Sequence, residues 1–149
     1  MRLADCVPTP QRFQYDTYVS VGDTNCFGTV YFTRYFEWQG RAREAFFRSV
    51  VPTFDMLLDT GHRVLTVTAS MEYFEDLQVF EPIQITMELA KLQQTSLELV
   101  FAFHRAARPV ALGRQRLVLV DAQGKPTVLP SEVRSALTPY VASSGVSRA

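Results

Sequence analysis

One long segment without proline limits the possible folds of this chain more than any other feature of its sequence. Residues 30–50 contain no proline and fit a single helix that stops before Pro52. Apolar and polar residues alternate through residues 13–21, which predicts a strand before this helix. A short connection ends at Gly61, and four strand-like runs follow it: residues 63–71, 83–92, 96–105 and 110–121.

The order of these segments predicts the fold class. One strand, one long helix and four strands must bury their apolar faces against one another. We therefore expect an α+β hotdog fold, in which a five-stranded antiparallel sheet wraps around one long central helix. An open sheet leaves unpaired edges, and pairing two sheets edge to edge in a dimer would cover one of them.

The remaining segments are short. Residues 93–95 and 122–125 predict turns between strands. Ser131 is expected to cap a short C-terminal helix that ends before Pro139. Chain length predicts a single domain over the 149 residues, with residues 1–11 and 142–149 as flexible termini.

Composition excludes several classes of protein. The 15 basic and 15 acidic side chains cancel, so no net field would attract nucleic acid or an anionic membrane. No apolar run approaches the roughly 20 residues of a membrane span, and residues 1–10 lack the apolar core of a signal peptide. A soluble, cytoplasmic protein is expected. Cys6, Cys26, His62 and His104 give neither a disulfide framework nor a metal-ligand spacing, so we expect no metal and no cofactor.

The predicted helix has two unequal faces on a helical wheel. Glu37 with Arg41, and Glu44 with Arg48, form i,i+4 pairs on a face that solvent should cover. Arg43 lies in the middle of the opposite, apolar arc, and Gln39 lies one turn before it. The apolar arc holds Tyr31, Phe32, Tyr35, Phe36, Ala42, Phe46, Phe47 and Val50.

Arg43 needs a partner, because a guanidinium stays charged and an unpaired buried ion is costly. Two interpretations remain open. In the first, Arg43 forms a structural salt bridge with Asp23, Glu72 or Glu75, within the chain or across a dimer. In the second, it lines an internal cavity and stabilises a developing anion or a substrate oxygen.

Other candidate groups surround this arginine in the sequence. Asn25 precedes the helix, where its amide could cap the helix or act with free backbone N–H groups to polarise a carbonyl. Cys26 beside it is interpreted as an inert thiol rather than a nucleophile, since no histidine is near in sequence. Tyr35 is either a hydrogen-bonding group or a core residue. Thr66, Thr68 and Ser70 alternate on one strand face that is expected to meet solvent.

Residues 21–32, running into Tyr35-Phe36-Glu37-Trp38, resemble the active-site loop and helix start of the 4-hydroxybenzoyl-CoA thioesterase family. The resemblance spans about residues 13–137. In that family the loop reads Gly-Asp-x-Asp, and the second Asp is the nucleophile or base. Asn25 occupies that position here, which departs from the family pattern.

Asn25 together with Trp38-Gln39-Gly40-Arg41-Ala42-Arg43-Glu44 resembles a subgroup, the acyl-carrier-protein polyene thioesterases of enediyne antibiotic biosynthesis. The resemblance implies Asn25 and Arg43 as the catalytic pair and a homo-oligomer, a dimer or a dimer of dimers. It implies hydrolysis of a β-keto polyenoyl thioester, held by phosphopantetheine on an acyl-carrier protein domain of a polyketide synthase. Loss of CO2 would then leave a methyl-ketone polyene. The substrate-binding candidates are Tyr35, Phe32, Gln39, Thr66 and Glu72.

Several alternatives stay open. Glu72 or Glu75 could support a conventional carboxylate mechanism. The chain could be an acyl-CoA thioesterase of the 4-hydroxybenzoyl-CoA type, or a non-catalytic module that binds an acyl-carrier protein. A hotdog hydratase or dehydratase would need a histidine beside an acid, and neither His62 nor His104 lies in such a motif.

Overall fold

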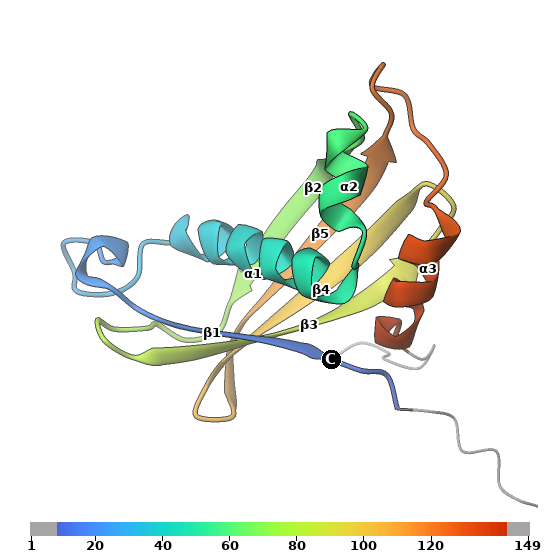
Figure 1. Ribbon diagram of the computed structural model, residues 1–149. Coiled ribbons are helices and arrows are strands. Elements are labelled where there is room, and N and C mark those ends of the chain that lie inside the picture. The colour runs from blue at the N-terminus through green and yellow to red at the C-terminus, as the bar shows by residue number, and fades with distance from the viewer. Residues whose placement is uncertain (1–8, 143–149) are drawn as a thin grey trace, which may run out of the picture.

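A computed structural model describes residues 9–142, in which one curved antiparallel sheet packs against a long helix (Figure 1). The strand order is β1-β3-β4-β5-β2, and all neighbours are antiparallel. This arrangement confirms the predicted hotdog fold. The strands are β1 (Phe13–Tyr18), β2 (Arg63–Tyr73), β3 (Pro82–Leu92), β4 (Ser96–Arg105) and β5 (Arg108–Val120). The α-helices are α1 (Arg34–Val50), α2 (Phe54–Asp59) and α3 (Ser131–Leu137), and 3-10 turns cover Val21–Asp23 and Thr138–Tyr140.

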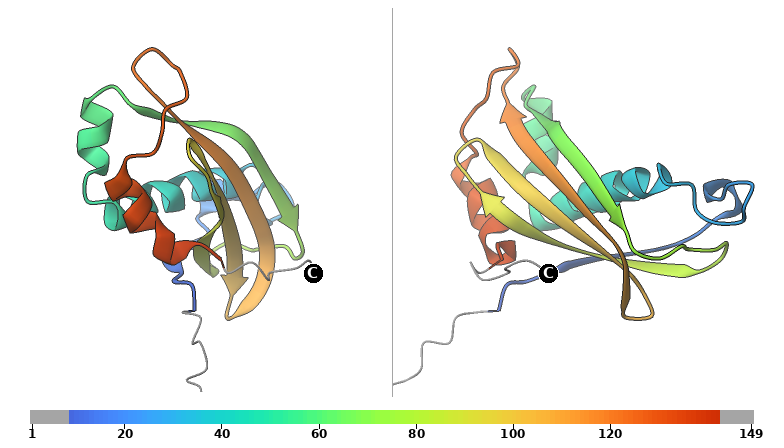
Figure 2. Two further views of the ribbon diagram at one scale, coloured as in Figure 1. Left: turned by 90° about the vertical axis from the view of Figure 1, so that its right-hand side faces the viewer. Right: turned by 180° about the vertical axis from the view of Figure 1, so that it is seen from behind.

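The core lies between α1 and the concave face of the sheet (Figure 2). Helical spacing places Tyr35, Trp38, Ala42 and Phe46 on the side of α1 that is buried. Alternate residues of the central strands point toward them and are also buried, each apolar side chain contributing about 1.5–3 kcal/mol. These are Ile83, Ile85, Met87 and Leu89 of β3 and Leu97, Leu99, Phe101 and Phe103 of β4.

Helix α1 begins at Arg34, not at residue 30 as predicted. Val30 instead forms an isolated β-bridge with Thr24, and its N–H donates to the Leu77 carbonyl at 3.0 Å. Tyr31 and Phe32 therefore precede the helix and are 47% and 54% exposed, so their predicted place on the buried helical face is wrong. A helical wheel contains no information on this tertiary pairing of the segment before the helix.

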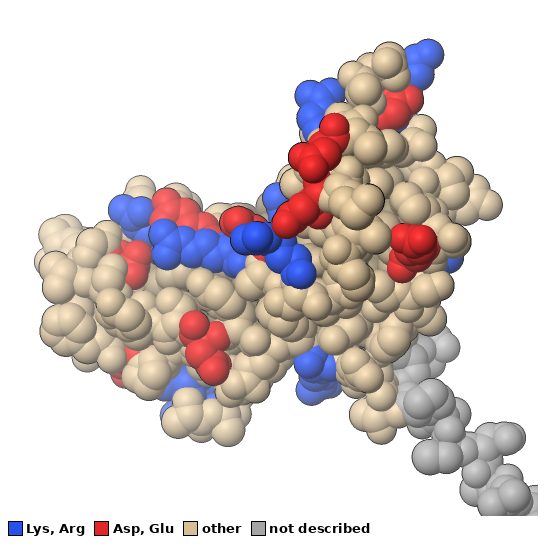
Figure 3. Space-filling model, viewed as in Figure 1, with Lys and Arg blue, Asp and Glu red and all other residues tan. Residues whose placement is uncertain are grey.

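The charged side of α1 is exposed, although its ion pairs differ from the predicted ones (Figure 3). Arg34 pairs with Glu37 at 2.9 Å, and Arg48 pairs with Asp55 of α2 at 3.6 Å. Neither predicted i,i+4 pair forms within residues 9–142. Exposed pairs contribute about 0–1 kcal/mol, so this difference has little effect on stability.

Smaller differences occur at the ends of elements. Helix α2 was not predicted, since six residues are too few for a helical period to show. The N-cap of α3 is Pro130 rather than Ser131, which is its first residue. Ala142 donates its N–H to the Leu89 carbonyl at 2.8 Å, so it is held against β3. Gln11, in the predicted N-terminal tail, donates its N–H to the Pro139 carbonyl at 2.8 Å, while residues 1–8 and 143–149 of the predicted flexible termini lie outside the described residues.

A β-bulge interrupts β2 and decides which side chains face α1. Thr66 pairs with Leu117, whereas Thr68 pairs with Arg116, so Val67 is an extra residue. Thr66 consequently faces α1, while Thr68 points to the other side of the sheet. The predicted common face for the Thr66, Thr68 and Ser70 stripe is wrong for this reason.

Strand β2 forms one edge of the sheet and pairs only with β5 among the described strands. Several large apolar side chains along it and just after it are exposed: Leu65 (44%), Val67 (51%), Tyr73 (43%) and Phe74 (53%). An exposed apolar edge is a surface on which another strand can pair. None of the helices within residues 9–142 is both long and apolar enough to span a membrane.

Gly113 of β5 makes room for a side chain from α1. A Cβ at this position would overlap the Gln39 amide and come too close to the Met71 sulfur. We expect Gly113→Ala to destabilise the fold by about 1–3 kcal/mol, because Gln39 is fully buried and cannot move aside. Gly40→Ala is the control: its Cβ meets open space, and alanine should stabilise α1 by up to about 1 kcal/mol. Chemical denaturation of both variants measures the difference, and equal stabilities would contradict this role of Gly113.

Candidate active site

Arg43 points from the middle of α1 toward the inner face of the sheet. Its Nη1 donates to Thr66 Oγ1 at 2.8 Å and to Gln115 Oε1 at 2.9 Å. Both acceptors are neutral. Burial lowers the pKa of the Arg43 guanidinium, but a guanidinium stays protonated in proteins. Arg43 therefore presents a positive charge that its nearest partners do not neutralise.

No carboxylate within residues 9–142 forms an ion pair with Arg43. Asp23 accepts hydrogen bonds from the N–H and hydroxyl of Ser20, at 2.8 and 2.7 Å. Glu75 instead forms ion pairs with Arg105 and Arg108. A structural salt bridge within the chain is thus the wrong interpretation of Arg43, and a salt bridge across a dimer stays a prediction.

Two glutamines lie behind Arg43 in the core. Gln115 Nε2 donates to Gln39 Oε1 at 2.9 Å, and Gln39 Nε2 donates to the Ser70 carbonyl at 3.0 Å. Gln39 is fully buried and Gln115 is 5% exposed. The predicted candidates Arg43, Gln39 and Thr66 are therefore brought together, each from α1 or β2.

Gln115 of β5 is the member of this cluster that sequence reasoning missed. A signal was present, because Gln115 is in phase with the apolar residues Leu117 and Leu119 on an alternating strand. A polar residue on an inward-facing strand position must find a hydrogen-bond partner in the core. Its pairing with α1 could not be read from spacing, since the two residues are 76 positions apart.

A cleft opens beside Arg43, between α1, α2 and the start of β2. Its volume is about 490 Å³, and Arg43 forms part of its wall. The apolar part of its lining is Phe47, Phe54, Leu58 and Val64, and charged residues Glu44, Arg48 and Asp55 lie around it. Phe47, Phe54 and Val64 also line a small apolar pocket that extends toward Leu97, Leu129 and Val133. The site thus combines Arg43, which has no ion-pair partner within residues 9–142, with a partly apolar surface, while Arg48 is paired with Asp55.

Asn25 lies in the loop before α1, and its side chain binds within that loop. Its Oδ1 accepts from the N–H of Phe27 at 2.9 Å, and its Nδ2 donates to Thr29 Oγ1 at 3.2 Å. The amide therefore caps its own turn rather than the helix. Arg43 follows the first residue of α1 by nine positions, about 13 Å along the axis, and no hydrogen bond joins it to Asn25 among the described residues.

The other predicted site residues lie away from Arg43. Tyr35 is buried against the rings of Trp38, Tyr73 and Phe103, and burial raises its pKa to about 12. Phe32 is exposed, and its carbonyl accepts from the Tyr73 hydroxyl at 2.8 Å. Glu72 pairs with Leu112 and lies on the outer face of the sheet, as strand alternation with Met71 requires.

The described residues offer few other reactive groups. Cys26 is an exposed free thiol in the loop before α1. Within residues 9–142, no group of three His, Cys, Asp or Glu side chains is arranged to hold a metal ion. The cluster around Arg43 can stabilise negative charge on an oxygen atom, because it offers guanidinium N–H donors in a partly desolvated setting.

Comparisons with known proteins identify the family. The sequence model of the thioesterase-like superfamily matches residues 19–137. No curated protein matches the sequence significantly. The fold resembles the dynemicin thioesterase, whose crystal structures describe polyene binding, with a TM-score of 0.83 and 28% identity over 90% of this chain and 100% of that one.

Two other thioesterases have the same fold. A gentisyl-coenzyme A thioesterase has a TM-score of 0.75 and 25% identity over 85% of this chain and 99% of that one. The 1,4-dihydroxy-2-naphthoyl-CoA thioesterase from Synechocystis has a TM-score of 0.78 at 19% identity, covering 86% and 96%, and supports the fold alone. This chain belongs to the thioesterase-like superfamily and is a hotdog-fold thioester hydrolase.

Proposed function

We propose that this thioesterase releases a β-keto polyenoyl chain from an acyl-carrier protein in enediyne polyketide biosynthesis, and that the released acid loses CO2 to leave a methyl-ketone polyene. The observation that carries the proposal is Arg43, a cation whose hydrogen-bond partners in the protein are neutral and which lies on the wall of a partly apolar cleft. The similarity to the dynemicin thioesterase supports the polyene as substrate.

The proposed hydrolysis uses the charge of Arg43 on the thioester oxygen. Water attacks the thioester carbon, and the carbonyl oxygen becomes an oxyanion that guanidinium N–H groups stabilise. Collapse of this intermediate breaks the C–S bond, and the phosphopantetheine thiolate takes up the proton that water loses. Thr66 Oγ1 accepts its bond from Arg43, so its own proton is free to hydrogen-bond the same substrate oxygen.

The same cation suits the second step. When the β-keto acid loses CO2, the electron pair of the broken C–C bond forms an enolate on the remaining ketone. Arg43 would stabilise the enolate oxygen, and protonation of the carbon then gives the methyl ketone. The apolar side chains Phe47, Phe54 and Val64 offer contact surface for a flat, conjugated chain beside the charge.

The site is proposed to be completed by a second copy of this chain. No hydrogen bond joins Asn25 to Arg43 within residues 9–142, and the free β2 edge carries exposed apolar residues. Pairing two copies along β2 would cover that edge and allow the Asn25 loop of one copy to approach Arg43 of the other. We propose an obligate dimer, which could pair further into a dimer of dimers.

Product analysis tests the proposal directly. The protein is mixed with a polyketide synthase whose carrier domain holds the polyene, and the products are identified by mass spectrometry. We expect a methyl-ketone polyene and free carrier thiol in the presence of the wild-type chain. Products that do not change when the protein is added would contradict the function, and release of acyl groups from coenzyme A alone would favour the acyl-CoA alternative.

Asn25→Asp tests whether the amide is suited to this site. We expect the fold to persist, because Asp can accept the same bond from the Phe27 N–H and the Thr29 hydroxyl can rotate to donate. Turnover should not rise greatly, since the neighbouring groups are arranged around a neutral side chain. Steady-state hydrolysis of the carrier-bound thioester measures this, and a large gain in rate would mean that Asn25 replaces a better catalytic Asp.

A further inference from the structure

A series of hydrogen bonds through two buried amides connects the backbone of β2 with the guanidinium of Arg43. It passes from the Ser70 carbonyl to Gln39, then to Gln115, then to Arg43, in steps of 3.0, 2.9 and 2.9 Å. Both glutamines are buried, so water cannot replace these bonds at low cost. The members come from three elements that are distant in sequence, α1, β2 and β5.

The direction of every hydrogen bond in this series is fixed by the groups at its two ends. The Ser70 carbonyl can only accept, so Gln39 must present its Nε2 there and its Oε1 to Gln115. Gln115 then donates through Nε2 and presents its Oε1 to Arg43. A guanidinium can only donate, which requires that same orientation. The two glutamine side chains therefore have one mutually consistent arrangement.

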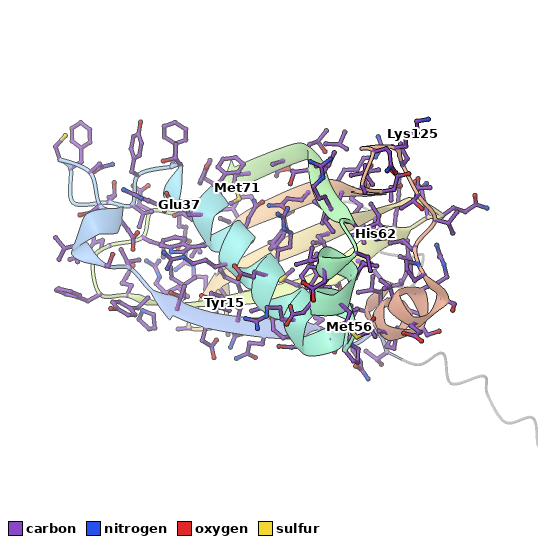
Figure 4. The ribbon with its side chains drawn as sticks, turned by 45° about the horizontal axis from the view of Figure 1, so that its top comes forward. Tyr15, Glu37, Met56, His62, Met71 and Lys125 are labelled. Atoms are coloured by element: carbon purple, nitrogen blue, oxygen red, sulfur yellow. The ribbon has the colours of Figure 1, made fainter. Side chains whose placement is uncertain are left out.

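The fold leaves space for these two glutamine side chains. Gln39 and Arg43 are one turn apart on α1 and so share a face. Gly113, two residues before Gln115 on β5, has no side chain where the Gln39 amide lies. Met71 of β2, which is labelled in Figure 4, is the cross-strand partner of Gly113, and its sulfur lies against Gln39 Nε2.

On the basis of the function proposed above, we propose that Gln39 and Gln115 are positioning residues that act through Arg43. Nη1 is occupied by Gln115 and Thr66, while Nε and Nη2 have no hydrogen-bond partner within residues 9–142. Fixing Nη1 fixes the plane of the rigid guanidinium. The two remaining donor atoms are then set in advance for the substrate oxygen, instead of being ordered at the moment of reaction.

A double-mutant cycle with the full-length chain tests this role. Gln115→Met, Arg43→Met and the double variant are assayed on one carrier-bound thioester, with folding followed by circular dichroism. We expect Gln115→Met to lower kcat roughly 10- to 100-fold with KM changed by less than about 2-fold. In the Arg43→Met background the same change should have no further effect on kcat. Additive losses would overturn the proposal, since Gln115 would then not act through Arg43.

Two further variants keep the test decisive. If Gln115→Met unfolds because Gln39 loses its partner, the paired Gln39→Met/Gln115→Met variant removes both amides together and is assayed instead. Unfolding of both would show a purely structural role and also overturn the proposal. Arg116→Met, on the outer face next to Gln115, is the control and should retain wild-type kcat.

The outcomes separate this proposal from the function on which it rests. If Arg43→Met retains wild-type turnover, the proposed function itself fails. If Arg43→Met is slow while Gln115→Met is as fast as the wild type, only the positioning role fails.

Discussion

Replacing Arg43 with methionine is expected to lower thioester turnover about 100-fold or more while the protein stays folded. The loss follows from removing the cation that faces the developing oxyanion. The free energy of unfolding should fall by about 1–3 kcal/mol, because only the Gln115 oxygen and the Thr66 hydroxyl lose a donor. Breaking a buried salt bridge would cost about 3–5 kcal/mol, so thermal melts combined with thioester hydrolysis distinguish the two cases.

The matched control is Arg41→Met, two positions away on the exposed side of α1. It should change neither turnover nor stability appreciably. Arg43→Lys should restore little activity, since an ammonium cannot hold Gln115 and Thr66 and still present a planar pair of donors to the substrate. An active Arg43→Met variant, or an inactive Arg41→Met variant, would contradict the role assigned to Arg43.

Introducing charge on the free edge of β2 is expected to separate the proposed dimer and abolish most of the activity. Leu65→Glu combined with Val67→Glu places carboxylates where two copies of the edge would meet. The variant should be monomeric by light scattering at micromolar concentration. Turnover should fall about 100-fold or more, because each site would lose the Asn25 loop of its neighbour.

Val128→Glu serves as the control for this edge variant. Val128 is also apolar and 62% exposed, but it lies in the segment between β5 and α3. It should leave both the dimer and the turnover intact. A wild-type chain that is monomeric at micromolar concentration would refute the dimer, and a fully active monomeric edge variant would refute a site shared between copies.

The sheet was predictable from sequence because its signals are local. Alternating apolar residues and short polar turns located β3 and β4 within one residue, and only the ends of β1, β2 and β5 shifted by one to three residues. The start of α1 was misplaced, because Val30 donates its N–H to the distant Leu77 carbonyl and residues 30–33 therefore lie outside the helix. That bond depends on tertiary structure, which periodicity does not contain.

The candidate site was only partly predictable. Arg43 was conspicuous as a charge on an apolar helical face, and Gln39 followed from being one turn away. Gln115 was missed because its partner is in another element, and Thr66 was placed on the wrong side of its strand because alternation assumes no bulge. Glu72 was favoured for its carboxylate, although the same strand turns it away from Arg43.

The extra residue Val67 also affects how this chain should be aligned with its relatives. Val64 and Thr66 before the bulge, and Ala69 and Met71 after it, would keep the same faces if Val67 were deleted. This single residue can therefore be inserted or deleted without moving any other side chain of β2 to the opposite face of the sheet. If a relative lacks this residue, an alignment without a gap at Val67 would match inward residues of one protein with outward residues of the other on one side of the bulge.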